Sequence, residues 1–244
     1  MQLKISNLLF GYNKPLLEHP VNIEVKQESF IVLIGKNGAG KSTFLKTLSG
    51  SLPALSGEIY INNELVTRQK ISSQISIVLT GKPNSNLKVH EILQMGRSPF
   101  TGFLDQLKDA DHLIIDHVVQ KLNIENLLDK NINEISDGEA QTVMIARALI
   151  QDTPVIFLDE PTTHLDLENK AKIFGLLKSL KEEGKIIIFS SHDVNWIVNQ
   201  VDQIWVIKGQ KFFKIKPTDL DKIKEIFSSK NLIFDEKCKT FKWI

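Results

Sequence analysis

The chain has 244 residues, of which 42% are apolar and 24% are charged, and its formal net charge at pH 7 is +1. These values are ordinary for a folded globular protein and exclude a disordered or fibrous chain. Because non-specific nucleic-acid binding usually needs a strongly basic domain, we expect no nucleic-acid partner.

Cysteine content and hydropathy bear on the compartment. The single cysteine, Cys238, cannot form an intramolecular disulfide, which fits a reducing compartment. No apolar run approaches the ~20 residues needed to cross a bilayer, and the first ten residues lack the pattern of a secretory signal. We therefore expect a cytoplasmic protein.

The first third of the chain is predicted to form strands and one helix. Residues 21–25 alternate apolar and polar side chains, as a strand with one buried face does. The continuous apolar run 30–34 predicts a central strand covered on both faces. We expect strands at 3–5, 21–25, 30–34, 59–61 and 75–79, and a helix at 41–48.

The middle of the chain is predicted to be helical, and strands return after it. Helical spacing at 91–96, 109–122 and 139–151 indicates a helical subdomain inserted into a sheet. The later alternation of strands and helices implies a parallel sheet. We expect strands at 155–158, 186–189 and 203–207, and helices at 166–181 and 194–200.

The end of the chain gives weaker patterns. The lysine-rich stretch 208–216 is interpreted as a solvated turn, followed by a short helix. The alternation in the final residues predicts a hairpin that covers other elements, and no function is assigned to residues 211–244.

A glycine-rich loop follows the strand at 30–34. Glycines allow backbone N–H groups to curl around an anion, and the start of the next helix adds partial positive charge. The sequence therefore predicts a phosphate loop, in which Lys41 pairs with the β- and γ-phosphates, Ser42 binds Mg²⁺ and Thr43 contacts an outer phosphate oxygen. Its residues are Gly35, Lys36, Asn37, Gly38, Ala39, Gly40, Lys41, Ser42 and Thr43.

Two acids end the apolar strand at 155–158. The carboxyl edge of a parallel sheet is where ligands bind. Asp159 suits a Mg²⁺ contact, and Glu160 suits the polarisation of a water that attacks the γ-phosphate. An isolated acid pair often serves only as a helix N-cap, but the phosphate loop favours the catalytic interpretation.

Further motifs resemble one family of phosphate-loop proteins. Ile135-Ser136-Asp137-Gly138-Glu139 is similar to the signature motif of ABC ATPases, Thr163-His164-Leu165-Asp166 to their D-loop, and Ser191-His192-Asp193 to their switch histidine. Tyr12 resembles their adenine-stacking aromatic residue, although a surface tyrosine fits there too. A serine-hydrolase relay is excluded because three adjacent residues cannot converge as that relay requires.

The resemblance implies an α/β fold with a P-loop NTPase core and parallel sheet, an N-terminal antiparallel β subdomain and an inserted helical subdomain. It implies a single ABC ATPase domain over 1–244: the nucleotide-binding core with the β subdomain at 1–80 and 152–210, the helical signature subdomain at 81–151, and an extension at 211–244.

The resemblance also implies cofactors and partners. ATP and Mg²⁺ would be bound, with Glu160, His192 and Lys41 as catalytic residues. Ser136, Gly138, Glu139 and Asp166 would contact nucleotide across a homodimer that encloses ATP. The dimer would bind permease subunits at the inner face of the membrane, and would serve a substrate-binding protein indirectly.

Two positions depart from the family pattern. Asp137 replaces a glycine, and its carboxylate would repel phosphate unless it points away or takes a left-handed backbone. Thr80 stands where the family places a glutamine that touches Mg²⁺, so Thr80 is a candidate for a shorter contact to the metal.

The segment from Val89 to Leu93, with Gly96-Arg97-Ser98-Pro99-Phe100, resembles importers of iron-siderophore, haem or cobalamin. A helix end followed by a turn describes the second stretch equally well. Two other functions stay open: a soluble ABC protein acting on ribosomes or DNA, and a nucleotide-binding regulatory subunit with weak turnover.

Overall fold

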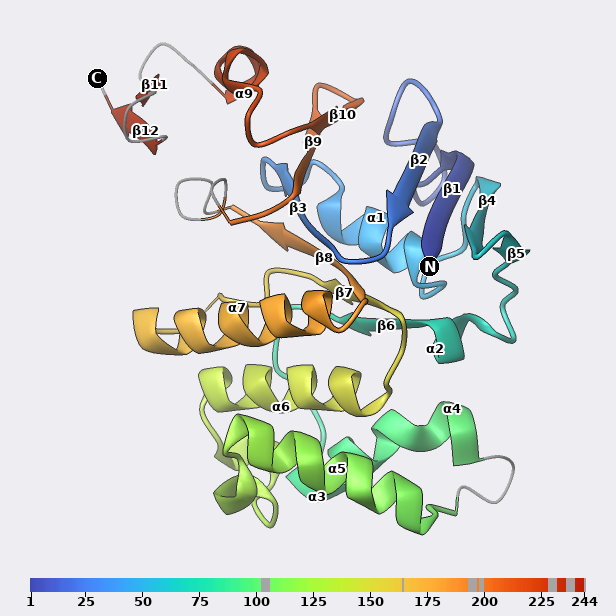
Figure 1. Ribbon diagram of the computed structural model, residues 1–244, viewed down its shortest axis with the longest axis vertical. Coiled ribbons are helices and arrows are strands. Elements are labelled where there is room, and N and C mark those ends of the chain that lie inside the picture. The colour runs from blue at the N-terminus through green and yellow to red at the C-terminus, as the bar shows by residue number, and fades with distance from the viewer. Residues whose placement is uncertain are drawn as a thin grey trace.

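A six-stranded sheet runs through the centre of the molecule (Figure 1). The computed structural model describes residues 1–101, 106–163, 165–192, 197, 200–227, 232–235 and 240–243, with the backbone alone for 220, 227, 232–235 and 240–243. The strand order is β10 (Lys211–Ile215), β9 (Gln203–Lys208), β3 (Ser29–Gly35), β8 (Ile186–Ser191), β7 (Val155–Leu158) and β6 (Ile75–Val78). All neighbours pair in parallel except β9 and β10.

The central strands are covered on both faces, as the apolar runs predicted. In β3, Phe30 and Val32 face one hydrophobic cluster, whereas Ile31 and Leu33 face the other. Side chains of a strand point alternately to its two faces. Strand β3 is therefore buried between two cores, and polar groups can meet solvent only beyond its ends.

A second, antiparallel sheet lies across the upper part of the molecule (Figure 1). Its order is β2 (Val21–Lys26), β1 (Gln2–Leu9), β4 (Ser56–Ile61) and β5 (Glu64–Leu65). Helix α1 (Lys41–Leu48) lies between the two sheets, and its Phe44, Leu45 and Leu48 share one core cluster with both. This packing fixes α1, and with it the glycine-rich loop before it.

Helices cover the other face of the central sheet. Helix α7 (Leu167–Glu182) lies against the sheet, and the helical subdomain follows below it (Figure 1). The elements between β5 and β7 are α2 (Ile71–Gln74), α3 (Val89–Gln94), η1 (Met95–Arg97), α4 (Ser98–Thr101), α5 (Asp109–Leu122), η2 (Glu125–Leu127), η3 (Ile132–Glu134) and α6 (Asp137–Ile150), with β6 following α2. The predicted fold class is confirmed.

Among the described residues, none of the helices combines the length and the apolar character that a membrane span requires.

The interpretation of residues 208–216 as a solvated turn was wrong. The turn consists of Gly209 and Gln210, both with positive φ, and β9 pairs with β10 on either side of it. The lysines mislead because exposed Lys211 and Lys214 stand between partly buried and buried apolar residues of the strand, such as the buried Ile215. Helix α9 (Leu220–Phe227) follows, and then a hairpin of β11 (Leu232–Asp235) and β12 (Thr240–Trp243).

Some predicted boundaries move. Helix α6 begins at Asp137, two residues before its predicted start, because Ser136 caps it. Strand β6 ends at Val78 and not at residue 79. The helix predicted over 194–200 lies largely outside the described residues.

Candidate functional site

The predicted phosphate loop connects β3 to α1. Gly35 has to be a glycine, because a Cβ there would lie 2.7 Å from the carbonyl oxygen of Ile207. Gly40 has a φ of +102° and stands at the N-cap of α1 without a side-chain cap. The first N–H groups of α1 therefore have no side-chain acceptor at this end, which suits an anion.

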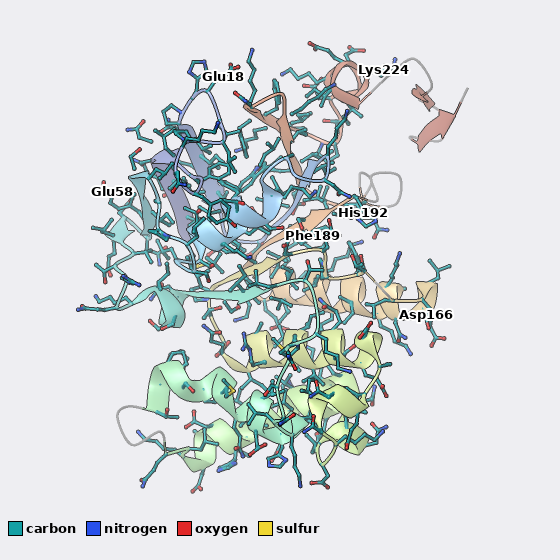
Figure 2. The ribbon with its side chains drawn as sticks, turned by 180° about the vertical axis from the view of Figure 1, so that it is seen from behind. Glu18, Glu58, Asp166, Phe189, His192 and Lys224 are labelled. Atoms are coloured by element: carbon teal, nitrogen blue, oxygen red, sulfur yellow. The ribbon has the colours of Figure 1, made fainter. Side chains whose placement is uncertain are left out.

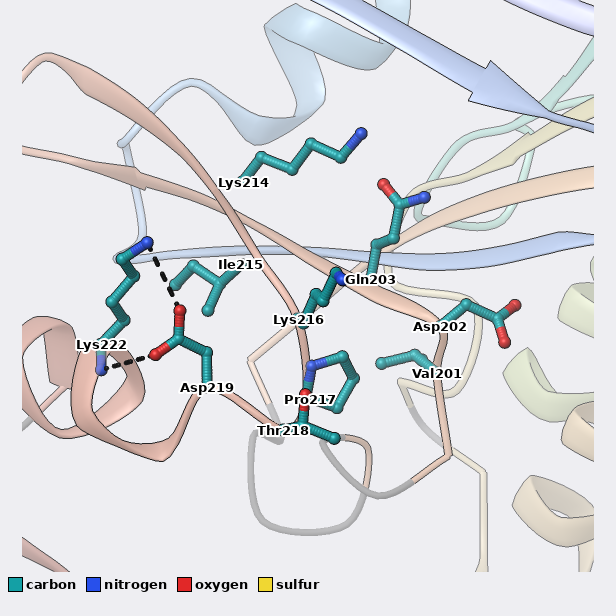
Figure 3. Close-up of a pocket in the computed structure, with 10 residues that line it drawn as sticks. All are labelled: Val201, Asp202, Gln203, Lys214, Ile215, Lys216, Pro217, Thr218, Asp219 and Lys222. Carbon is teal, nitrogen blue, oxygen red and sulfur yellow. Dashed lines mark hydrogen bonds and ion pairs between the residues drawn. The ribbon is translucent and has the colours of Figure 1, made fainter.

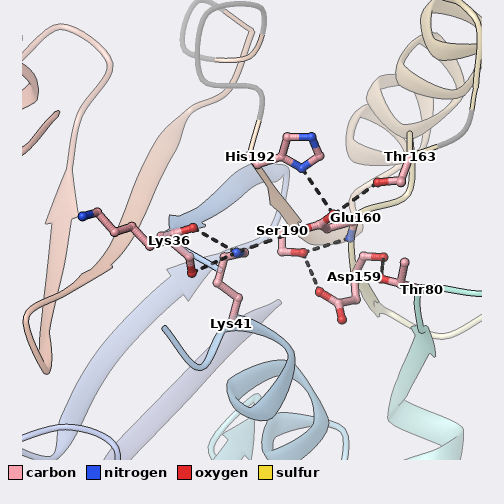
Figure 4. Close-up of polar contacts among 9 residues, drawn as sticks. Lys36, Lys41, Thr80, Asp159, Glu160, Thr163, Ser190 and His192 are labelled. Atoms are coloured by element: carbon pink, nitrogen blue, oxygen red, sulfur yellow. Dashed lines mark hydrogen bonds and ion pairs between the residues drawn. The ribbon is translucent and has the colours of Figure 1, made fainter. Parts of the chain in front are cut away.

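Lys41 turns its side chain back over this loop. It is 6% exposed, and its Nζ donates to the carbonyl oxygens of Gly35 at 2.9 Å and Lys36 at 3.5 Å. The same Nζ lies 3.9 Å from Oε1 of Glu160. The ammonium group thus lies between the phosphate loop and the acid pair, as Figure 4 shows.

Asp159 and Glu160 follow β7 at the carboxyl edge of the sheet. Asp159 is 4% exposed, and its Oδ1 accepts a hydrogen bond of 2.6 Å from the hydroxyl of Ser190. The N–H of Glu160 donates to the same hydroxyl oxygen at 2.9 Å. Ser190 thus fixes both acids, and sequence reasoning missed it. The only signal was a polar residue at the end of an apolar strand.

The carboxylate of Glu160 is the centre of a small polar network (Figure 4). Its Oε2 accepts from Thr163 Oγ1 at 3.2 Å and lies 3.3 Å from Nδ1 of His192. Glu160 has a φ of +49°, a left-handed value that is uncommon for glutamate. The backbone therefore turns so that this carboxylate faces Lys41 and His192. Asp193, the last residue of that motif, lies outside the described residues.

The residues predicted for Mg²⁺ offer hydroxyl and carboxylate oxygens. Ser42 lies in the first turn of α1, and Asp159 follows β7 with one carboxylate oxygen occupied by Ser190. Thr80 donates from Oγ1 to the backbone carbonyl of Asp159 at 2.8 Å, so its hydroxyl lies at the same sheet edge. Hydroxyl and carboxylate oxygens are hard donors, which fit Mg²⁺.

The predicted signature segment forms the start of α6. The hydroxyl of Ser136 accepts from the N–H of Glu139, and the N–H and hydroxyl of Ser136 both donate to Glu139 Oε2 at 2.8 Å. Glu139 thus completes a capping box. The backbone N–H and the hydroxyl of Ser136 hold the pKa of the Glu139 carboxyl below its ordinary value.

The backbone at Asp137 decides between the two explanations given above for this departure from the family pattern. Asp137 lies in the first turn of α6 with an exposed side chain, and it is not among the residues with positive φ. The left-handed option is therefore excluded. Negative side chains in the first turn of a helix interact favourably with its dipole, which explains how the fold accepts this aspartate.

The predicted D-loop residue Asp166 lies close to the same segment. Its side chain caps α7 by accepting from the N–H of Asn169 at 2.8 Å. A cavity of about 580 Å³ is lined by both the Ser136–Glu139 segment and Asp166. Asp166 and His192 both lie toward one edge of the molecule in Figure 2. His164 lies outside the described residues.

Tyr12 lies in a turn beside the phosphate loop. Its side chain is 66% exposed, whereas the neighbouring Phe10 is buried and packs on Phe44 of α1 with ring centroids 4.9 Å apart. Leu16, at the other end of the turn, lies against Gly40. The turn is thus anchored next to the loop while the tyrosine ring stays accessible.

A further cavity of about 830 Å³ lies between the C-terminal strands and the start of α9 (Figure 3). Its two acidic groups, Asp202 and Asp219, already have partners. Asp219 pairs with Lys222 at 3.4 Å, and Asp202 pairs with Lys181 at 2.9 Å and accepts from the N–H of Phe30. We therefore place the candidate site at the phosphate loop.

Comparison with known proteins identifies relatives of this chain. A family model described as ABC transporter matches residues 19–163. An uncharacterized ABC transporter ATP-binding protein of Methanocaldococcus jannaschii is 34% identical over 96% of this chain and 84% of its own length. An iron(3+)-hydroxamate import ATP-binding protein of Bacillus subtilis is 35% identical, over 79% of this chain and 74% of its own. A petrobactin import ATP-binding protein of the same species is 30% identical over 89% and 87%.

Solved structures share the fold. A metal-chelate type ABC transporter in an inward-facing conformation superposes with a TM-score of 0.78 at 26% identity, covering 92% of this chain and 88% of that one. A dimeric ATP-binding cassette in a post-hydrolysis state, bound to ADP and Pi, gives a TM-score of 0.77 at 25% identity, with 88% and 98% covered.

Proposed function

This chain belongs to the ABC transporter family of ATP-binding subunits, and from that premise we propose that it hydrolyses MgATP to drive transport through a separate permease. The observation that carries the proposal is the network around Glu160. One carboxylate there faces the phosphate-loop lysine, a histidine and a threonine at the carboxyl edge of a parallel sheet.

The residues divide the chemistry among them. The N–H groups of the loop and of α1 bind phosphate oxygens, and Lys41 exchanges its carbonyl partners for the β- and γ-phosphates. Glu160 orients the attacking water and takes up its proton. His192 holds the Glu160 carboxylate and contacts the γ-phosphate. In these roles each group would stabilise charge that develops in phosphoryl transfer.

Mg²⁺ would be held by Ser42 and Asp159, with Thr80 as a weaker candidate. Bound there, the ion neutralises charge on the phosphate oxygens. Ser190 occupies Oδ1 of Asp159, so Oδ2 is the oxygen that Asp159 would offer to the ion.

We propose a head-to-tail homodimer in which Ser136 and Gly138 of one subunit contact the ATP of the other, with Glu139 and Asp166 supporting that contact. The helix N-terminus at Ser136 suits a phosphate. The dimeric, ADP-bound relative supports this arrangement. Tyr12 would stack on the adenine from its exposed position beside the loop.

The transported substrate is proposed from the relatives. Two of them are named for the import of iron(3+)-hydroxamate and of petrobactin. We propose import of an iron-siderophore complex, with haem or cobalamin as alternatives in the same group.

The subunit would lie at the inner face of the membrane, bound to permease subunits through its helical subdomain and served indirectly by a substrate-binding protein. We also propose, from the family resemblance, that the chain is divided into a nucleotide-binding core with the β subdomain at 1–80 and 152–210, a helical subdomain at 81–151 and an extension at 211–244.

The test is ATP turnover and oligomeric state of the purified protein beside Glu160→Gln. We expect turnover to fall at least about 100-fold because the group that activates water is lost. ATP binding stays, and the variant accumulates as an ATP-bound dimer. Glu64→Gln, an exposed change on β5, is the matched control and keeps wild-type turnover.

One outcome would contradict the proposal. If the wild-type protein binds ATP but neither hydrolyses it nor dimerises, alone or with its permease, then the subunit is regulatory. The exposed Asp137 would then be the first residue to replace, with glycine.

A further inference from the structure

The loop that follows β6 touches two parts of the proposed machinery. Thr80 donates to the backbone carbonyl of Asp159, directly before Glu160. Two residues later, Lys82 donates from Nζ to the backbone carbonyl of Ile135 and, at 3.2 Å, to that of Asn133. One short stretch of chain therefore contacts both the residue that follows β7 and the segment before α6.

The second contact lies directly beside the signature residues. Ile135 is 4% exposed, and it immediately precedes Ser136, the N-cap of α6. Of the bonds between this loop and segment 131–136, that of Lys82 reaches nearest to the N-cap. Asn133 Nδ2 and Asn131 Nδ2 donate to the carbonyls of Ser85 and Asn86, farther along the loop.

Lys82 also brings a positive charge to this helix end. With the hydrogen bonds from Ser136 as the main cause, the charges of Lys130 and Lys82 further lower the pKa of the Glu139 carboxyl. Lys130 is exposed, and within the described part of the chain its side chain makes no hydrogen bond to residue 133 or 135. The two lysines thus share the charge effect, but only Lys82 binds the backbone that leads to Ser136.

We propose that Lys82 is a positioning residue for ATP hydrolysis, which fixes the Ile135–Ser136 backbone relative to Asp159 and Glu160. The inference rests on the proposed ATP-enclosing dimer. If the signature segment is held at a fixed place on the core, Ser136 is already oriented toward the partner's nucleotide when the dimer forms, and less conformational entropy is lost. Gly81, which has a φ of +102° and open space around it, gives the loop its turn between the two contacts.

The first test uses Lys82→Met in the Glu160→Gln background. We expect the ATP concentration for half-maximal dimerisation to rise about tenfold, because two hydrogen bonds to backbone carbonyls are lost. ATP binding to the monomer, measured with a fluorescent analogue at low protein concentration, stays unchanged because the phosphate loop is intact. Lys82→Arg restores most of the dimerisation.

Lys130→Met is the matched control, since it removes a nearby charge without breaking a bond to the segment. Equal loss in Lys130→Met, or no loss in Lys82→Met, overturns the inference.

A second measurement keeps the inference separate from the dimer. In the monomer, amide hydrogen exchange over residues 131–139 should become faster in Lys82→Met and stay the same over α1. Unchanged exchange overturns the positioning role even if dimerisation is affected. If Glu160→Gln alone fails to dimerise, the proposed dimer is lost, and the exchange rates still decide the role of Lys82.

Discussion

Ser190 shows how much one buried hydroxyl can organise. It is fully buried at the end of β8, where it donates to Asp159 and accepts from the N–H of Glu160. A hydroxyl that satisfies two buried polar groups leaves both unpaired when it is removed. The two acids therefore depend on Ser190 for their relative positions.

Ser190→Ala is predicted to lower kcat about tenfold, because a small displacement of a reacting group has a large effect on rate. The ATP concentration at half-maximal rate should change little, since the phosphate loop is untouched. Steady-state kinetics of Ser190→Ala beside the wild-type protein measures both quantities.

The matched control is Ser76→Ala. Ser76 is 1% exposed in the same sheet, and its hydroxyl has no partner among the described residues. Its removal leaves nothing unpaired, so we expect wild-type kinetics. Equal effects in the two variants would show that Ser190 acts only through stability.

At the scale of elements, the sequence predicted buried strands better than surface ones. Strand β8 has an unbroken apolar run, which identifies it without reference to the rest of the fold. In β10, Lys211 and Lys214 flank the apolar Phe212 and Phe213, and only pairing with β9 settles that this stretch is a strand. Tertiary context decides the structure of such segments.

The stretch around Arg97 has a structural explanation that its motif did not give. Arg97 is 8% exposed, lies 2.7 Å from Oδ1 of Asp111 in α5, and donates to the carbonyl of Ile150 at the end of α6. Its guanidinium also lies 4.4 Å from the ring centroid of Phe100. The N–H of Lys108 and the Arg97 side chain hold the pKa of Asp111 below its ordinary value.

Arg97→Met is predicted to lower the melting temperature by about 5 °C or more, because it leaves a buried carboxylate and a helix-terminal carbonyl without their partner. Thermal unfolding followed by circular dichroism measures the change. Arg68→Met, an exposed arginine between β5 and α2, serves as control and should melt like the wild type. A melting temperature within 1 °C of the control, on the scale of single surface changes, would mean that Arg97 does not join these helices.

For the whole molecule, the C-terminal part belongs to the main core at least as far as α9. Ile215, Ile223 and Ile226 are buried in the cluster that also holds Phe30 and Phe189 of the central sheet. The sequence could not assign this role, since the spacing of apolar residues says which face is buried but not against which partner.

Ile223→Ala is predicted to destabilise the protein by about 2–5 kcal/mol, the usual range when a buried isoleucine is truncated. Urea unfolding measures it, and Glu225→Ala on the exposed face of the same helix is the control. A loss below about 1 kcal/mol, or a separate unfolding transition for α9, would contradict a common core.

Some residues of the site can be predicted from local sequence motifs, whereas others depend on contacts between distant parts of the chain. The phosphate loop and the acid pair are contiguous motifs, so the sequence identified Lys41 and Glu160 directly. Ser190 and Lys82 act through contacts with residues 31 and 53 positions away, which only the folded chain brings together. The sequence cannot show such pairings before the sheet order is known.

The left-handed backbone of Glu160 has a consequence for engineering. A glutamate at a φ of +49° is strained by about 1–3 kcal/mol, whereas glycine or asparagine takes that conformation more readily. A laboratory search for heat-resistant variants would therefore reward replacement of this residue, and with it the loss of the carboxylate that activates water. Selection for thermal stability alone would therefore favour variants that no longer hydrolyse ATP. Any such search has to screen for ATP turnover in the same step.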